Sequence, residues 1–425
     1  MKLAVVVQRY GADISGGAEL HARYVAERLA RHASVEVLTT CARDYVTWKN
    51  ELPAGTETIN GLTVRRFPVT HPRDTKQFGR LSQLVFERTH SIHDELNWLE
   101  SEGPTSPALV KYVESHVNDF DFFIFFSYRY YHAFKGARAV AAKAVLVPTA
   151  ERDPAIGLRI FQPVFRGVRA LMYNSLEERA LIEHVSGRKG PGVVVGVGSD
   201  IPERTQPWRF KKKFNLRRPF ALYIGRIDEN KGCTELFSNF ERYAIMYPHG
   251  LDLVLIGSSL LPIPKHPRIR HLGFLPDEDK FDALAASDLL IMPSRFESLS
   301  MVALEAWALG RPVLANGHCD VLRGQAVRSN AGLYYENFEE FSEALYLLEG
   351  TGPLGGVLGR NGREFFRRHY AWPVIERKYL EMLERLKREP ATAMEPLPGF
   401  FAKRKKSERP AEQVVSSAPR GPVRK

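Results

Sequence analysis

The chain has 425 residues, of which 44% are hydrophobic and 26% charged, a composition typical of a soluble globular protein with two or more domains. Residues 400–425 contain eight Lys or Arg and two Glu, so they supply +6 of the formal net charge of +11. The rest of the chain is only weakly basic, which argues against nucleic acid as the main partner, and three scattered cysteines argue against a disulfide framework.

The first half of the chain alternates apolar runs with helical patterns. Residues 18–32 place Ala and Val at helical spacing, and they lie between two runs that are typical of buried parallel strands. This alternation predicts an α/β domain over residues 1–205. The predicted strands are 2–8, 34–40, 62–67, 122–126, 143–148, 170–174 and 192–197.

A polar, basic and Pro-containing stretch at 205–219 separates this pattern from a second one. The later alternation predicts a second doubly wound domain over 206–370, so that two Rossmann-like domains face a cleft. A helix over 371–390 follows, and the Pro-, Ser- and Lys-rich residues 391–425 are predicted to be disordered. The predicted elements of the second domain are strands 220–225, 251–257, 269–274, 289–294 and 312–316 and helices 233–247, 277–287 and 300–310.

Ligands of open α/β sheets bind outside the carboxyl ends of the strands, so the loops after strands are the candidate sites. In the loop GADISGGAE, Gly16 and Gly17 stand at the start of the first helix. Glycines there let a ligand approach the backbone, and free N–H groups at a helix N-terminus attract anions. A tight turn without function is the alternative.

The loop GRIDENKG places Arg226 and Lys231 after a buried strand. An Arg fork and a Lys point charge at such a position favour binding of a diphosphate. The alternative is a solvated turn with two surface charges.

The segment SRFESLSMVALEAWALGRPVLAN contains two carboxylates, Glu297 in a loop and Glu305 on the following helix. Ser300 is predicted to cap that helix, and Gly310 to end it. A loop carboxylate suits sugar hydroxyls and a deeper one suits a ribose diol, while the amides of residues 298–302 face an anion between them. Two solvated glutamates are the alternative.

The order GGAE, YIGRIDENKG and PSRFESLSMVALEAWALGRPV resembles the retaining GT-B glycosyltransferases of glycosyltransferase family 4. The resemblance covers nearly all of residues 1–388 and is strongest over 220–316, where the E-x7-E pattern lies. YNSLEER (173–179) and GVGSD (196–200) are weaker matches.

The resemblance implies a nucleotide-sugar donor on the C-terminal domain and a glycan, lipid-linked or small-molecule acceptor on the N-terminal domain. The sequence has no visible aspartate-rich metal-binding cluster, so we expect neither a cofactor nor a catalytic metal. The resemblance places Arg226 and Lys231 at the diphosphate, Glu297 at the donor sugar and Glu305 at the ribose. Two further sets of residues are implied to bind the donor: Ser298, Leu299, Ser300 and Met301 by their backbone, and Gly273, Phe274 and Leu275 around the base.

The chain departs from this family at VPTAERDP, where the family often has a His and this sequence has Glu151. Glu151 and Asp153 are therefore candidates to orient an acceptor hydroxyl, with Glu151 in a catalytic role. The nearby His132 is interpreted as structural, since a lone His is more often so.

The altered position leaves open a second function, a non-catalytic protein that binds nucleotide sugars or glycans. A third is an interaction protein whose tail, GFFAKRKKS (399–407), docks weakly on an anionic membrane. The short apolar N-terminal run and the odd number of cysteines favour a cytoplasmic protein, in the third case peripheral on the inner face of the membrane.

Overall fold

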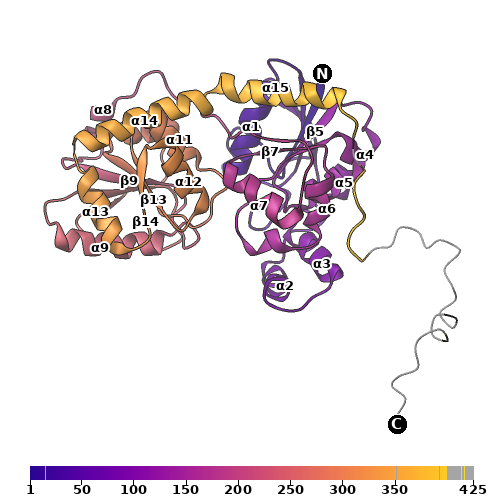
Figure 1. Cartoon of the computed structure of the whole chain (residues 1–425), viewed down its shortest axis with the longest axis horizontal. Coiled ribbons are helices and arrows are strands. Elements are labelled where there is room, and N and C mark those ends of the chain that lie inside the picture. The colour runs from indigo at the N-terminus through magenta and orange to yellow at the C-terminus, as the bar shows by residue number, and fades with distance from the viewer. Residues whose placement is uncertain (15, 351, 392, 400–412, 414–415, 417–425) are drawn as a thin grey trace, which may run out of the picture.

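The computed structural model describes residues 1–14, 16–350, 352–391, 393–399, 413 and 416. Two α/β domains stand side by side, and two successive helices run along the top of the molecule, α14 (Pro353–His369) over the C-terminal domain and α15 (Trp372–Arg388) over the N-terminal domain (Figure 1). This arrangement of two Rossmann-like domains is the GT-B fold, so the predicted fold class is confirmed.

The N-terminal sheet has the strand order β3-β4-β2-β1-β5-β6-β7-β8, and its pairs are parallel except for β3 with β4. Its middle strands are apolar runs buried on both faces, as a parallel sheet between helices requires. The strands are β1 (Lys2–Val6), β2 (Ser34–Thr40), β3 (Gly55–Ile59), β4 (Leu62–Phe67), β5 (Phe122–Phe126), β6 (Ala144–Val147), β7 (Ala170–Tyr173) and β8 (Gly192–Val194).

Helices cover both faces of this sheet, and α2 and α3 project from its lower end (Figure 1). The carboxyl ends of β1, β5 and β6 lie at one edge, which brings the loops after these strands together. The helices are α1 (Gly17–Leu29), α2 (Thr75–Glu87), α3 (Ile92–Glu102), α4 (Pro107–Ser115), α5 (Tyr131–Ala139), α6 (Phe161–Gly167) and α7 (Leu176–Ser186), with short 3-10 turns η1 (Ala141–Lys143) and η2 (Pro154–Gly157).

The C-terminal sheet is wholly parallel, in the order β11-β10-β9-β12-β13-β14. Its central strands β9 and β12 are adjacent, so the loops that carry the predicted cations and glutamates leave neighbouring strands. The strands are β9 (Phe220–Ile224), β10 (Asp252–Ile256), β11 (Ile269–His271), β12 (Leu289–Met292), β13 (Val313–Asn316) and β14 (Gly332–Tyr335). The helices are α8 (Pro207–Lys213), α9 (Cys233–Met246), α10 (Asp277–Ala286), α11 (Met301–Ala308), α12 (Asp320–Ser329), α13 (Phe338–Leu348) and α14 (Pro353–His369).

The connection between the domains is fixed by glycines that pack on aromatic rings. A Cβ on Gly198 would lie 2.7 Å from the Trp372 ring, and one on Gly196 would lie 2.7 Å from Tyr370. The Trp372 indole donates to Asp200 at 2.8 Å. The start of α15 is thereby attached to the linker, and α15 then packs on α1 and β8 of the N-terminal domain.

The first residues of the predicted C-terminal tail contact the N-terminal domain. Residues 393–399 are described, and Met394 and Leu397 pack against the N-terminal core. Gly167 leaves room for Met394, and Arg166 pairs with Glu395 at 2.7 Å. Two apolar side chains of the predicted tail thus lie against a matching surface of the N-terminal domain, and the disorder of the tail stays a prediction. The remaining expectations about the tail, including membrane contact, fall on residues 400–425, which apart from 413 and 416 lie outside the described residues.

Within the described residues, no helix has the length and apolar character that crossing a membrane requires.

Candidate active site

The first loop is built around Gly16, which precedes α1 and has φ 149°. A Cβ there would lie 2.2 Å from a carboxylate oxygen of Glu19 and 3.1 Å from the Arg9 guanidinium. Glu19 and Arg9 form a buried ion pair at 2.7 Å. Gly16 is therefore required by the packing of this pair, while Gly17 beside it has open space.

The second loop turns on Asp228, which accepts from the Lys231 backbone N–H at 2.8 Å and pairs with Arg226. Arg226 also donates to the hydroxyl of Tyr45 at 2.8 Å. Tyr45 belongs to the N-terminal domain, so Arg226 extends into the space between the domains.

Lys231 and Glu297 form an ion pair at 2.7 Å between Nζ and Oε1. Gly232 makes this approach possible, because a Cβ there would lie 2.2 Å from the carbonyl oxygen of Pro293 at the end of β12. Burial opposes the charge of Lys231, but the neighbouring Glu297 outweighs it and the pKa of Lys231 is raised. The two residues predicted to bind diphosphate and sugar are thus brought together.

Glu305 is 2% exposed and lies on the inner face of α11. Its Oε1 accepts from Ser199 at 2.7 Å and from Lys280 at 3.2 Å. Its Oε2 is buried and has no partner among the described residues. A buried carboxylate oxygen without a donor is costly, so this atom is an acceptor suited to a ligand hydroxyl.

The start of α11 has the predicted form. Ser300 accepts from the Ala303 N–H at 3.2 Å, as a capping side chain does, and Gly310 with φ 70° follows the helix. Ser298, Leu299 and Met301 are half-buried at this helix start. Ser298 is also reached by Asn174 of the N-terminal domain at 3.4 Å.

Glu151 follows β6 in the N-terminal domain and lies near the same charges. Burial, together with the nearby Glu297, raises the pKa of Glu151 to about 7, whereas Lys231 opposes the shift. Thr149, two residues earlier, has φ 49°, a left-handed conformation that is strained for a branched side chain. The structure thus brings Glu151 into electrostatic contact with both predicted donor-binding residues.

Asp153 and His132 lie in structural positions. Asp153 pairs with Arg129 at 2.6 Å and caps η2. His132 is fully buried in α5, and burial lowers the pKa of its imidazole to about 3. Arg129 is bound in turn to Glu102 at 2.9 Å, so these residues form a support beneath the Glu151 loop.

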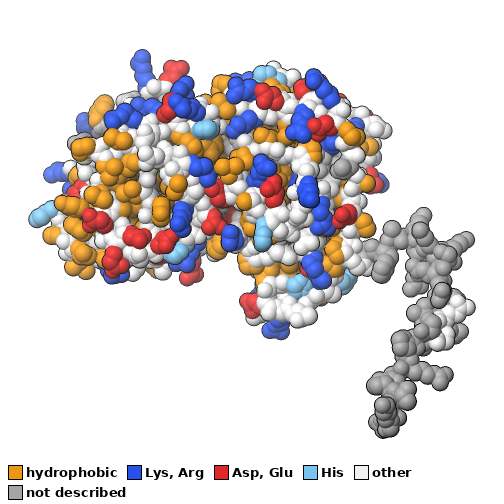
Figure 2. Space-filling view, viewed as in Figure 1, with side chains coloured by type: hydrophobic (Ala, Val, Ile, Leu, Met, Phe, Trp, Pro, Cys, Tyr) orange, Lys and Arg blue, Asp and Glu red, His pale blue; other side chains and the backbone are white. Residues whose placement is uncertain are grey.

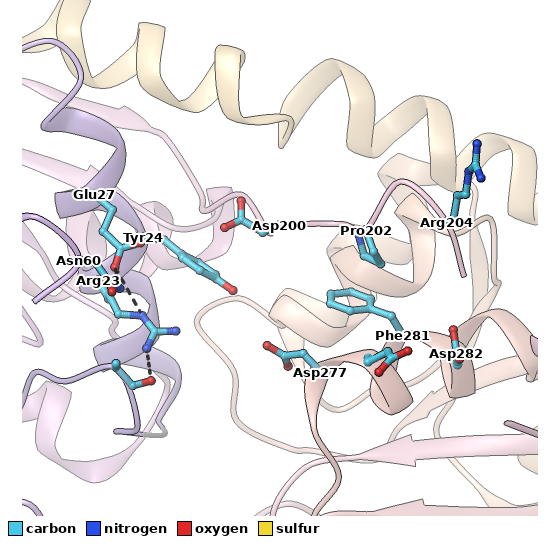
Figure 3. A pocket seen from close by; sticks show the side chains of 12 residues that line it. Arg23, Tyr24, Glu27, Asn60, Asp200, Pro202, Arg204, Asp277, Phe281 and Asp282 are labelled. Atoms are coloured by element: carbon cyan, nitrogen blue, oxygen red, sulfur yellow. Dashed lines mark hydrogen bonds and ion pairs between the residues drawn. The ribbon is translucent and has the colours of Figure 1, made fainter. Parts of the chain in front are cut away.

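The predicted base-binding segment is joined through Gly257 to the backbone of the Arg226 loop, since a Cβ on Gly257 would lie 1.9 Å from the carbonyl oxygen of Gly225. Gly273 has φ 74° and accepts from the Gly257 N–H at 2.8 Å, while Phe274 is 77% exposed and Leu275 half-buried. A cavity of about 490 Å³ opens a few residues further along, with Tyr24 of α1 on one side and Asp277 and Phe281 of α10 on the other (Figure 3). None of the predicted donor-binding residues, all of which are described, lines it.

Three side chains at this site had no signal in the sequence: Tyr45, Ser199 and Lys280. Tyr45 comes from the stretch 44–110, which carries no recognisable pattern. Ser199 lies in GVGSD, a weaker family match to which no binding role was assigned, and Lys280 is one of many helical lysines.

Where the two domains adjoin, acidic and basic side chains gather on the surface (Figure 2). No group of three or more His, Cys, Asp or Glu suited to a metal occurs in the described part of the chain.

Comparison with known proteins gives a consistent result. Residues 218–349 match the family model "Glycosyl transferases group 1". An uncharacterized glycosyltransferase of Methanocaldococcus jannaschii is 25% identical over 357 residues, covering 74% of this chain and 80% of that protein. A D-inositol 3-phosphate glycosyltransferase of Corynebacterium urealyticum is 26% identical over 345 residues, covering 73% and 76%.

Solved structures share the fold at low identity. Sucrose-phosphate synthase from Thermosynechococcus elongatus aligns with a TM-score of 0.64 and 15% identity, covering 91% of this chain and 99% of that one. Anabaena HepE in complex with UDP-glucose aligns with a TM-score of 0.66 and 18% identity, covering 91% and 100%. From the matched segment, the relatives and the fold together, the chain is a glycosyltransferase of the GT-B fold class.

Proposed function

We propose that the chain is a retaining glycosyltransferase that moves a sugar from a nucleotide-diphosphate donor to a glycan, lipid-linked or small-molecule acceptor without a catalytic metal. One observation carries this proposal. Lys231 and Glu297 of the C-terminal domain form a close ion pair, and both interact electrostatically with Glu151 of the N-terminal domain. Charged groups of the two domains thus interact with one another, which supports a reaction site between a donor on one domain and an acceptor on the other.

The leaving group is a diphosphate, so negative charge develops on it as the bond to the sugar breaks. Arg226 and Lys231 supply two cations, and the helix start at Ser300 adds N–H donors. A preorganised donor of this kind contributes about 3 kcal/mol to transition-state stabilisation. These groups provide the stabilisation that a metal ion supplies in other transferases.

Donor binding exchanges the partners of the Lys231–Glu297 pair. A diphosphate is a stronger partner for Lys231 than one carboxylate, because it carries more negative charge. Glu297 is then released to accept hydrogen bonds from sugar hydroxyls. The unpartnered Oε2 of Glu305 accepts from a ribose hydroxyl, while Oε1 keeps its bonds to Ser199 and Lys280.

Glu151 faces the sugar from the acceptor side and orients the acceptor hydroxyl. Its pKa of about 7 lets it hold or release a proton near neutral pH, which suits a group beside a reacting hydroxyl. Retention follows if the acceptor attacks on the side from which the diphosphate leaves, with the departing phosphate oxygen taking the hydroxyl proton. The three cysteines are all free and buried, which supports a reducing, cytoplasmic location.

The test is a transfer assay with a panel of nucleotide sugars. UDP-glucose is the first donor, because HepE was solved with it, and inositol and hexose phosphates are the first acceptors, because a relative is named for such a substrate. Proton NMR of the product then compares its anomeric configuration with that of the donor. An inverted product contradicts the retaining mechanism, and donor binding without transfer or hydrolysis favours the non-catalytic alternative.

A further inference from the structure

Glu178 stands at the third position of α7, in the pattern Ser175-x-x-Glu that predicts a capping box. Half of that box is present, since Ser175 accepts from the Glu178 N–H at 3.1 Å. In a complete box the Glu side chain would accept from the N–H of the capping residue itself. Here it does something else: Oε2 accepts from the Asn174 N–H, and Oε1 accepts from the Ala150 N–H at 2.5 Å.

The two N–H groups belong to the two halves of the candidate site. Ala150 lies directly before Glu151 and directly after the strained Thr149. Asn174 follows β7, and its side chain donates to Ser298 at the start of α11 in the other domain. One carboxylate therefore ties the acceptor-side loop to a residue that contacts the donor-side loop.

Helix capping alone does not account for this carboxylate. Glu178 is 1% exposed, and burying a carboxyl group costs several kcal/mol, whereas a cap contributes about 1 kcal/mol. An exposed Glu would complete the box without that cost. Burial also raises the pKa of Glu178 to about 8, with backbone N–H donors opposing the shift.

We propose that Glu178 is a positioning residue, which holds the Ala150–Glu151 peptide and the Asn174–Ser298 contact in fixed register for sugar transfer. This inference rests on the proposed function. Glu178 does not touch the reacting atoms; it orients Glu151 through the peptide before it and stabilises the left-handed Thr149.

The experiment compares Glu178→Gln with Glu183→Gln in the full chain. A glutamine keeps the size of the side chain, but its amide group cannot accept the second N–H. Glu183 lies on the same helix, has a side chain that is 41% exposed, and pairs with Arg179 at 2.8 Å, so it is the matched control. We expect kcat to fall at least tenfold in Glu178→Gln, with the KM for the donor changed less than threefold, because the donor cations lie in the other domain. The control changes neither.

Amide hydrogen exchange supplies a second measurement that needs no donor. The Ala150 and Asn174 amides should exchange slowly in the wild type and faster in Glu178→Gln, while the rest of α7 should keep its protection. Unchanged kcat in a folded Glu178→Gln, a fall in activity that the control shares, or unchanged exchange at both amides overturns the inference. If the wild type neither binds nor transfers any nucleotide sugar, the proposed function fails, and the exchange result still decides the role of Glu178.

Discussion

The donor side and the acceptor side of the candidate site are built in different ways. On the donor side, Arg226 and Lys231 are about one-third exposed and bind carboxylates within the same domain, from loops that leave adjacent strands. On the acceptor side, Glu151 is supported by fully buried groups such as Glu178 and by the Arg129–Asp153 pair. The donor side is thus a set of solvent-accessible charges on a rigid sheet edge. The acceptor side is a strained loop held by buried hydrogen bonds, so substitutions should affect the two sides differently.

The largest effect is expected from Lys231→Ala. The change removes a cation from the diphosphate and leaves Glu297 without its partner, so kcat/KM should fall about 100- to 1,000-fold while the melting temperature changes little. Steady-state kinetics and thermal unfolding measure both. Lys212→Ala, an exposed lysine of α8, is the control. A folded Lys231→Ala enzyme with wild-type turnover would contradict the assignment of Lys231 to the diphosphate.

A smaller effect is expected from Glu305→Gln. Glutamine keeps the contact with Ser199 but loses the charged acceptor, a difference of about 2 kcal/mol for a hydrogen bond to a charged group, or roughly 30-fold in affinity. Calorimetry with a nucleoside diphosphate and with its 2′,3′-dideoxy analogue separates the ribose contribution. Equal weakening of both ligands contradicts a contact with the ribose hydroxyls.

Two buried histidines of the N-terminal domain, His21 and His132, should make the free energy of unfolding depend on pH. Burial lowers the folded-state pKa of His21 and of His132 to about 3, below the unfolded value of about 6.5. The unfolded state therefore binds more protons below pH 6.5, and the stabilisation present above that pH is lost as the pH falls toward 3. For each histidine the free energy of unfolding should fall by about 1.4 kcal/mol per pH unit.

Urea unfolding at pH 7 and pH 5.5 tests this expectation. His132→Asn should lose less stability between the two pH values than the wild type does, although it is less stable at pH 7. The exposed His93→Gln is the control. A wild-type pH dependence that His132→Asn leaves unchanged would show that this imidazole titrates normally.

Glu151 should change the free energy of unfolding with pH in the direction opposite to the histidines. Its folded-state pKa of about 7 lies above the ordinary carboxyl value of 4.5, so the stability it contributes is present below pH 4.5 and is lost as the pH rises through 7. Glu151→Gln should therefore lose less stability than the wild type between pH 5 and pH 8. It should also remove a limb with a midpoint near pH 7 from the pH profile of kcat. The same limb in both proteins would assign that titration to another group.

The smallest effect is expected from Arg328→Ala. Arg328 pairs with Glu177 across the two domains, with 2.9 Å between Nη2 and Oε2. An ion pair with access to solvent contributes about 0–1 kcal/mol, and 1 M salt should screen what it contributes. A change of more than about tenfold in kcat/KM would indicate that domain closure depends on this pair rather than on the central site.

The difference between the two sides also explains what could be predicted from the sequence. Arg226, Lys231, Glu297 and the Ser300 cap could be found because they follow apolar runs whose order determines which loops meet. Parallel strands place their carboxyl ends at one edge of the sheet, so the order of the strands in the sequence is enough to predict that these loops lie close together. The predicted strands of both sheets agree with the observed ones to within a few residues.

The contacts of the acceptor side could not be predicted from the order of the strands. Glu178 looks like an ordinary capping box, and its contact with Ala150 joins residues 28 positions apart through side-chain direction alone. Tyr45 reaches Arg226 across 181 positions from a loop without periodicity. The contacts of Met394 and Leu397 depend on an apolar surface of the N-terminal domain, which composition does not reveal.

Nucleoside diphosphate binding to the wild type and to the double variant Arg226→Ala/Lys231→Ala tests the central claim most directly. With uridine, guanosine and adenosine diphosphates at 100 times Kd, the preferred ligand should stabilise the wild type by about 2.7 kcal/mol and raise its melting temperature, and the double variant should lose that rise. If none of the three ligands shifts the wild type, or if the double variant shifts equally, the two cations do not hold a diphosphate between the domains.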